Sequence, residues 1–129
     1  VELRKKNLFL EFTNSFMAGK GHELRNKYHP DFLEFYQNFD VSDNILADFR
    51  KMAEAKGIKW DDQLYNNDKE FFKTYIKSYL AQSIWNRSKF YEIFNSELLK
   101  GKMILKLQLN SGNVLKIGDY LILLWKRYL

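Results

Sequence analysis

A long stretch without glycine or proline, residues 68–97, has apolar side chains at the spacing of an amphipathic helix. Its apolar stripe comprises Phe72, Tyr75, Ile76, Tyr79, Leu80, Ile84, Tyr91 and Phe94. The basic residues that lie mostly off this stripe are Lys69, Lys73, Lys77 and Arg87. Asp68 is the expected N-cap, and Glu70 places negative charge near the positive end of the helix dipole. The pattern predicts one long helix around which the rest of the chain packs.

A second helical pattern covers residues 2–18, where apolar side chains recur at spacings of three and four. They are Leu8, Phe9, Phe12, Phe16 and Met17. Gly19-Lys20-Gly21 is expected to end this helix, because glycine readily takes the left-handed conformation at a helix C-terminus. The pattern of residues 22–30 fits either a helix or a loop. His29-Pro30 should be extended or turned, because a residue before proline avoids the α region.

The clearest start and stop signals belong to the helix predicted between Ser42 and Gly57. Ser42 is a good N-cap, and Val41 before it can pack on Leu46 as a hydrophobic staple. Gly57 is expected to close the helix. The buried stripe predicted for this helix is Ile45, Leu46, Phe49, Met52 and Ala53.

Two shorter segments flank that helix. Asp31 is expected to cap a short helix that contains Phe32, Leu33, Phe35, Tyr36 and Phe39. Residues 58–60 are predicted to form a short extended link after Gly57. Asp61 or Asp62 is then expected to cap a turn of helix that precedes the long one.

Residues 98–129 form a tail whose composition differs from that of the body, residues 1–97. The tail carries the whole net charge of +5, since it has six basic residues and one acidic residue while the body has 15 of each. Residues 105–109 alternate apolar and polar, and residues 110–113 give a strong turn signal, which together predict a β-hairpin. Residues 120–129 are apolar but too short to span a bilayer, which needs about 20 residues, so we expect either a last strand or a docking helix there.

At 129 residues, the chain is expected to form one domain or to be a piece of a larger protein. Aromatic residues make up 17% of the chain, so much of the core should consist of Phe, Tyr and Trp. The predicted fold is mainly α: a compact bundle of about four helices in residues 1–97, followed by a β-hairpin or an apolar docking segment. The chain starts without Met and without the apolar core of a signal peptide, so we expect that it was cut from something longer.

No set of residues has the spacing of a known catalytic or metal site. The absence of cysteine excludes disulfides, a thiol nucleophile and a Cys-based zinc site. His22, Glu23 and His29 lack the HExxH spacing and are expected in a surface connection, while Asp61-Asp62 is explained by helix capping. A Ser–Lys pair stays open, although nothing marks one. We therefore predict no catalytic, cofactor-binding or metal-binding residue and no cofactor.

Aromatic and basic residues at positions 71–91 are of the types that stack on nucleic-acid bases, but their helical spacing favours core packing. The residues expected to pack rather than to carry chemistry are Ile84, Trp85, Phe90, Tyr91 and Phe94. The basic tail has the charge to contact phosphates or anionic lipid, yet its apolar content favours burial or pairing with a partner.

Three segments of the body together resemble a known family. They are ELRKKNLFLEFTNSF, VSDNILADFRKMAEAKGI and FFKTYIKSYLAQSIWNRSKFYEIFNSE. Their distinctive positions are Leu3, Leu8, Phe9 and Phe12; Val41, Ser42, Asp43 and Phe49; and Ile84, Trp85, Asn86, Phe90, Tyr91 and Asn95. This pattern is similar to the region that follows the catalytic core in bacterial carboxyl-terminal processing peptidases, the tail-specific S41-type serine proteases.

The resemblance covers residues 2–97 and implies a non-catalytic C-terminal accessory domain. Such a domain would pack on the protease core and PDZ domain of its parent chain and shape substrate access or oligomerisation. The parent would act on protein or peptide substrates in the periplasm or cell envelope. The family's PDZ domain and Ser–Lys dyad have no counterpart here, so no catalytic residue is carried over. Residues 98–129 depart from the family, which usually continues into another short helix.

Two other hypotheses come from different classes. One is a small stand-alone module that binds nucleic acid or protein through its basic tail, although the neutral body disfavours nucleic acid. The other is a helical interaction domain that self-associates through its apolar tail. Salt dependence separates the first from an accessory domain, because binding through several phosphate contacts weakens steeply as salt rises.

Overall fold

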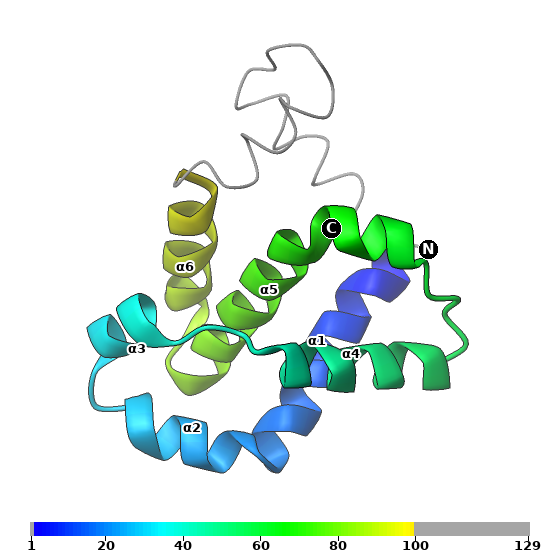
Figure 1. Cartoon of the computed structure of the whole chain (residues 1–129). Coiled ribbons are helices and arrows are strands. Elements are labelled where there is room, and N and C mark those ends of the chain that lie inside the picture. Colours follow the sequence, from blue (N-terminus) through cyan, green and yellow to red (C-terminus); the bar gives the residue numbers. More distant parts are fainter. Residues whose placement is uncertain (1, 100–129) are drawn as a thin grey trace.

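Figure 1 shows the computed structural model, which describes residues 2–99 of the chain. Six helices lie within this range: α1 (Glu2–Ala18), α2 (Gly21–Tyr28), α3 (Phe32–Asn38), α4 (Asp43–Ala55), α5 (Asp62–Ile84) and α6 (Arg87–Leu99). The predicted mainly α-helical bundle is therefore confirmed, with more helices than expected. The hairpin predicted at residues 105–113 and the strand or docking helix predicted at residues 120–129 lie outside the described residues.

Helix α5 lies at the centre of the bundle, packed against α6 and α1 (Figure 1). Its buried side chains are Phe71, Thr74, Tyr75, Ile76, Lys77, Ser78, Tyr79, Leu80, Ala81 and Ile84. The Tyr75 ring joins both neighbours, with centroids 4.6 Å from Phe9 of α1 and 5.8 Å from Phe90 of α6. Full burial of one such apolar side chain contributes about 1.5–3 kcal/mol. The predicted central stretch is thus the centre of the core.

The single long helix predicted for residues 68–97 is wrong, because the chain turns at Trp85 and Asn86. Asn86 is the N-cap of α6, and its Oδ1 accepts a hydrogen bond from the Lys89 amide at 3.3 Å. An asparagine side chain that bonds the backbone in this way competes with a continuous helix. The predicted start is also wrong, since α5 begins at Asp62 and Asp68 lies inside it.

Helix α1 forms over the predicted range, but the expectation that a left-handed glycine ends it is wrong. Gly57 is the only residue with a positive φ that the structure describes, so neither Gly19 nor Gly21 is left-handed. Gly21 instead allows close approach, because a Cβ there would lie 2.6 Å from Met17 Sδ. The crossing of α1 and α2 therefore depends on the missing side chain of Gly21.

The ambiguous residues after Gly21 form helix α2, which ends in a turn at His29-Pro30. The predicted turn is confirmed, but the reason given for it is wrong, because His29 lies in the α region before the proline, at φ −51° and ψ −40°. This turn leads directly into α3, and Asp31 caps α3 as predicted by accepting from the Glu34 amide at 3.1 Å.

Both ends of α4 form as predicted. The Ser42 hydroxyl accepts from the Ile45 amide at 3.3 Å, and Val41 and Leu46 are both buried. At the other end Gly57 has φ +84°, and the Ile58 amide reaches back to the Ala53 carbonyl at 3.1 Å. This is the hydrogen-bond pattern of a Schellman motif, in which glycine fills the left-handed position.

Two side chains lie where the sequence pattern did not place them. Lys77 was expected off the apolar stripe, yet it is only 8% exposed, and its Nζ donates to the Tyr36 carbonyl at 3.0 Å. Tyr91 was expected to pack but is 44% exposed, whereas Ile84 and Phe90 are buried as predicted. Trp85 and Phe94 are partly buried against the core.

Candidate functional site

A surface pocket of about 120 Å³ lies where α1, α4 and α5 meet the connection between α4 and α5. Its lining is mostly apolar and comprises Leu8, Phe9, Phe49, Ala53, Ile58, Lys59, Trp60, Asp61, Tyr65 and Phe72. We call it the Trp60 pocket. It has the character of a small binding site, with apolar walls and few polar groups.

Aromatic rings form the wall of the Trp60 pocket. The Trp60 ring lies 5.0 Å from Tyr65, 6.2 Å from Phe72 and 6.3 Å from Phe49, measured between centroids. Phe49 in turn stacks on Phe9 at 4.7 Å. These distances are within the range at which aromatic pairs attract one another. The aromatic wall therefore runs from the connection between α4 and α5, at the surface, to the centre of the core.

The Trp60 indole nitrogen is buried and has no hydrogen-bond partner. The Trp85 indole, by contrast, donates to the His29 carbonyl at 3.1 Å. Buried side-chain donors nearly always have a partner, and leaving one unpaired costs about 1–3 kcal/mol. Trp60 Nε1 is therefore an exception to that rule within the part of the chain that the structure describes.

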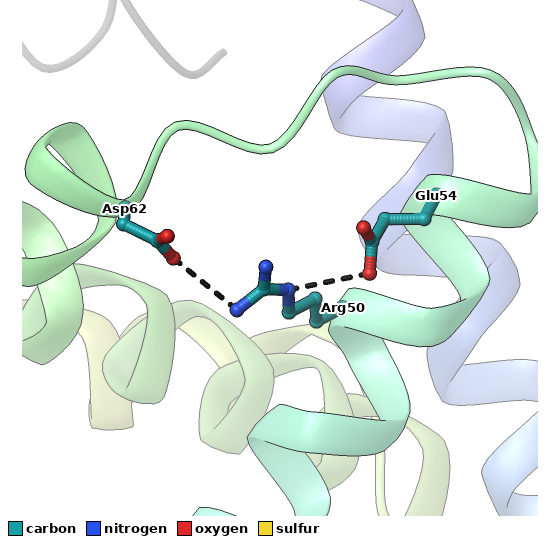
Figure 2. Close-up of polar contacts among 3 residues, drawn as sticks. All are labelled: Arg50, Glu54 and Asp62. Atoms are coloured by element: carbon teal, nitrogen blue, oxygen red, sulfur yellow. Dashed lines mark hydrogen bonds and ion pairs between the residues drawn. The ribbon is translucent and has the colours of Figure 1, made fainter.

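Arg50 fixes the connection on which Trp60 lies (Figure 2). Its Nε binds Glu54 Oε1 at 3.2 Å, and its Nη1 binds Asp62 Oδ1 at 3.2 Å, which joins α4 to the start of α5. Its guanidinium also lies 5.4 Å from the centre of the Trp60 ring. Each ion pair is solvent-exposed and therefore weak, so the contribution of Arg50 is mainly to position the connection.

Burial raises the pKa of the Tyr65 hydroxyl, and Lys69 and Asp43 shift it in opposite directions to a smaller extent. Burial raises the pKa of Tyr75 and Tyr79 as well, and the interaction between the two phenol groups adds to the shift of Tyr75. Tyrosines shifted in this direction stay protonated at neutral pH. They can hold a proton or donate a hydrogen bond, but they do not provide a base.

The structure does not bring the candidate polar residues of the sequence together into a site. His22 and Glu23 lie on α2, and His29 lies in the turn after it. Within residues 2–99 no group of three or more His, Cys, Asp or Glu side chains has the arrangement to hold a metal ion. Asp62 is engaged by Arg50.

Trp60 was not identified from the sequence as a pocket residue, because it was assigned only to an extended link. The link is confirmed as non-helical. The available signal was a large aromatic residue between two charged ones, Lys59 and Asp61, in a short connection.

No helix in the part of the chain that the structure describes is long and apolar enough to cross a membrane.

A family described as a family of unknown function (DUF8443) matches residues 1–86, which include α1 to α5. Neither the comparison with curated proteins nor the comparison with solved structures finds a match.

Proposed function

Given that the chain belongs to DUF8443, a family of unknown function, we propose that its helical body is a non-catalytic accessory domain of an S41-type carboxyl-terminal processing serine protease. In this proposal the domain packs on the protease core of a longer chain and shapes the access of protein or peptide substrates. The S41 assignment comes from the sequence resemblance. The non-catalytic part of the proposal is supported by what the resembling residues do in the fold.

The observation that carries the proposal is that two polar positions of the resemblance cap helices. Ser42 caps α4 and Asn86 caps α6, each by accepting from a backbone amide three residues later. The apolar positions Phe49, Ile84 and Phe90 are buried in the core. A motif made of caps and core residues specifies a fold, whereas a catalytic motif would place reactive side chains beside one another.

The helical arrangement suits a rigid body that positions other parts of a protein. Its core joins α1, α4, α5 and α6 through a continuous set of aromatic contacts, from Phe49 to Phe9 to Tyr75 to Phe90. Such packing moves as one unit, which is what a domain needs in order to hold a substrate channel or a subunit contact in place. The proposed periplasmic or envelope location follows from the resemblance.

The reading frame upstream of Val1 provides the first test. The proposal expects it to encode a PDZ domain and a core with a Ser–Lys dyad. An upstream frame that encodes no protease would contradict it. So would hydrolysis of peptides by the present chain alone, if one Ser→Ala change in this chain abolished that activity.

A longer chain that contains both the protease core and this domain provides the second test. A version without residues 2–99 should keep the Ser–Lys chemistry on a short peptide but should change in kcat/KM for folded protein substrates or in oligomeric state. A matched control carries Ser88→Ala, which alters a helical position of α6 outside the caps and the core. Identical kinetics and oligomeric state with and without the domain would overturn the accessory assignment.

A further inference from the structure

We propose that a polar pocket between α3, α5 and α6 binds a small zwitterion of the size of a free α-amino acid. The carboxylate of the ligand lies against Lys73 and Thr74, and its ammonium group lies against Glu70. We call this site the Thr74 pocket. The inference goes beyond the accessory-domain proposal, because it concerns the pocket alone and holds with or without a protease core.

The Thr74 pocket has a volume of about 280 Å³ and lies where the end of α3, the middle of α5 and the end of α6 meet. One face of α5 lines it with polar residues at helical spacings of three and four, namely Glu70, Lys73, Thr74 and Lys77. Sites for drug-sized ligands occupy roughly 300–1,000 Å³. The pocket therefore suits a molecule smaller than these, such as an amino acid.

The Thr74 hydroxyl is a buried polar group that lacks a partner. Thr74 is only 6% exposed, yet its oxygen makes no hydrogen bond to another described residue. Two other buried hydroxyls, those of Thr13 and Ser78, donate to the carbonyl four residues earlier, at 2.9 and 2.7 Å. Among the described side chains, Trp60 Nε1 alone is sealed from solvent without a partner. The unpaired Thr74 oxygen therefore reaches solvent, and the space beside Thr74 is that of the pocket.

Lys73 supplies positive charge next to this hydroxyl. Its side chain is 20% exposed, and its Nζ lies 3.7 Å from Asp40 Oδ2. Because a charge-assisted hydrogen bond spans roughly 2.7–2.9 Å, this loose ion pair leaves the ammonium group able to donate to another acceptor. Lys77 adds a second positive charge, since it is 8% exposed and donates to the neutral carbonyl of Tyr36 at 3.0 Å. A ligand carboxylate can accept from both Lys73 and the Thr74 hydroxyl.

The carboxylates of the pocket require that the ligand also carries a positive charge. The pocket is lined by Asp40, Glu70 and Glu97, which outnumber its lysines, so an anion without a cation would be repelled.

Glu70 is the carboxylate placed to receive that positive charge. It is partly buried and has no ion pair or hydrogen bond with another described residue. It lies one helical turn before Thr74, and such neighbours have Cβ atoms about 5–6 Å apart. The ammonium and carboxylate groups of an α-amino acid, which are joined through a single carbon, can therefore reach Glu70 and Thr74 together.

Nuclear magnetic resonance of the full chain with labelled threonine methyl groups tests the proposal directly. The chain has two threonines, Thr13 and Thr74, so each methyl signal is assigned by one Thr→Val variant. The probe is L-serine, whose side chain is small and polar. We expect a saturable shift of the Thr74 signal on titration. The Thr13 signal should stay in place, because Thr13 lies on α1 and does not line the pocket.

Two analogues of the probe separate its charges. N-acetyl-L-serine lacks the ammonium group and L-serinamide lacks the carboxylate. Each should bind at least roughly tenfold more weakly than L-serine, because each loses a hydrogen bond between charged groups. Binding of N-acetyl-L-serine as tight as that of L-serine would identify an anion site, and equal binding of L-serinamide would identify a cation site. Either result overturns the assignment of a zwitterion.

Variants of the chain test the residues. Thr74→Val removes the hydroxyl at nearly constant volume and breaks no hydrogen bond with a described residue, so it should fold. It should weaken L-serine binding roughly tenfold, measured from the backbone amide signals of residues 70–77. Thr13→Val is the matched control, since it loses its bond to the Phe9 carbonyl but should keep the affinity. Glu70→Gln should weaken L-serine binding and leave the weak binding of N-acetyl-L-serine unchanged.

The proposal is overturned if L-serine leaves the Thr74 signal unmoved up to its solubility limit. It is also overturned if Thr74→Val and Glu70→Gln bind L-serine as tightly as the unaltered chain does. Equal shifts at Thr13 and Thr74 would show a general effect of the amino acid on the chain and would count against a site. None of these results bears on the accessory-domain proposal, whose own test is the upstream reading frame.

Discussion

The Trp85 indole donates to the main-chain carbonyl of His29 across 3.1 Å, and this bond ties the end of α5 to the turn between α2 and α3. The Trp85 ring also packs edge-on against Phe35 and Phe32 of α3, with centroids 5.3 Å and 5.1 Å away. One side chain at the break between α5 and α6 therefore anchors the α2–α3 pair to the centre of the bundle.

Trp85→Phe should consequently lower the free energy of unfolding by about 1–2 kcal/mol, through the lost hydrogen bond and lost ring contacts. Urea unfolding followed by circular dichroism measures this change. Trp60→Phe is the matched control and should cost less, because the Trp60 donor has no partner to lose. A loss in Trp85→Phe no larger than that in Trp60→Phe would contradict a stabilising role for the bond to His29.

Gly57→Ala should destabilise the chain by about 1–2 kcal/mol, because a residue with a Cβ is strained at φ +84°. Gly19→Ala is the control, since its added Cβ would meet only the Ser15 carbonyl, at 4.0 Å, and its φ is not positive. That variant should be neutral or slightly stabilising. The two midpoints of urea unfolding compare the positions directly, and a Gly57→Ala midpoint no lower than that of Gly19→Ala would refute the argument from backbone strain.

Asn86→Ala should cost about 1 kcal/mol, because it leaves the first amides of α6 without a side-chain acceptor. Asn86→Asp keeps an acceptor and adds negative charge at the helix N-terminus, so it should recover most of the loss. Thermal unfolding of the two variants distinguishes them. If both variants unfold at the temperature of the unaltered chain, the cap is not what starts α6.

Alkaline pH should destabilise the fold through its buried tyrosines. Burial raises the pKa of Tyr75, so above about pH 10 the unfolded state loses the phenol proton while the folded state keeps it. The free energy of unfolding then falls as pH rises, by at most about 1.4 kcal/mol per pH unit for each such group.

Urea midpoints at pH 8 and pH 11 test this expectation. Tyr75→Phe should reduce the loss of unfolding free energy between pH 8 and pH 11, because a phenylalanine has no proton to release. A loss of stability that is the same in Tyr75→Phe and in the unaltered chain would place the alkaline sensitivity elsewhere in the chain.

Three features that depend on a few adjacent residues were predicted correctly from the sequence. Asp31 and Ser42 cap their helices as expected, and Gly57 closes α4, because each of these interactions spans only a few positions. Features that depend on a distant partner were missed. Lys77 is buried because its ammonium group reaches the carbonyl of Tyr36 at the end of α3, and no pattern within α5 contains that information.

The Trp60 pocket was missed for the same reason. Its walls come from three helices and a connection, and the unpaired state of the indole donor depends on the folded arrangement of all of them. The break at Asn86 is an intermediate case, since the sequence contains a residue suited to a cap but surrounds it with helix-forming neighbours.

The central position of α5 also defines the cooperative unit of this protein. The part that matches the family ends at residue 86, yet Phe90 and Ile93 of α6 are buried, and Phe90 lies 4.9 Å from Tyr79 and 5.8 Å from Tyr75. A fragment cut at Asn86 would expose these tyrosine rings to water and invite aggregation. The boundary for expression and engineering therefore belongs after α6, beyond the limit that sequence similarity alone would set.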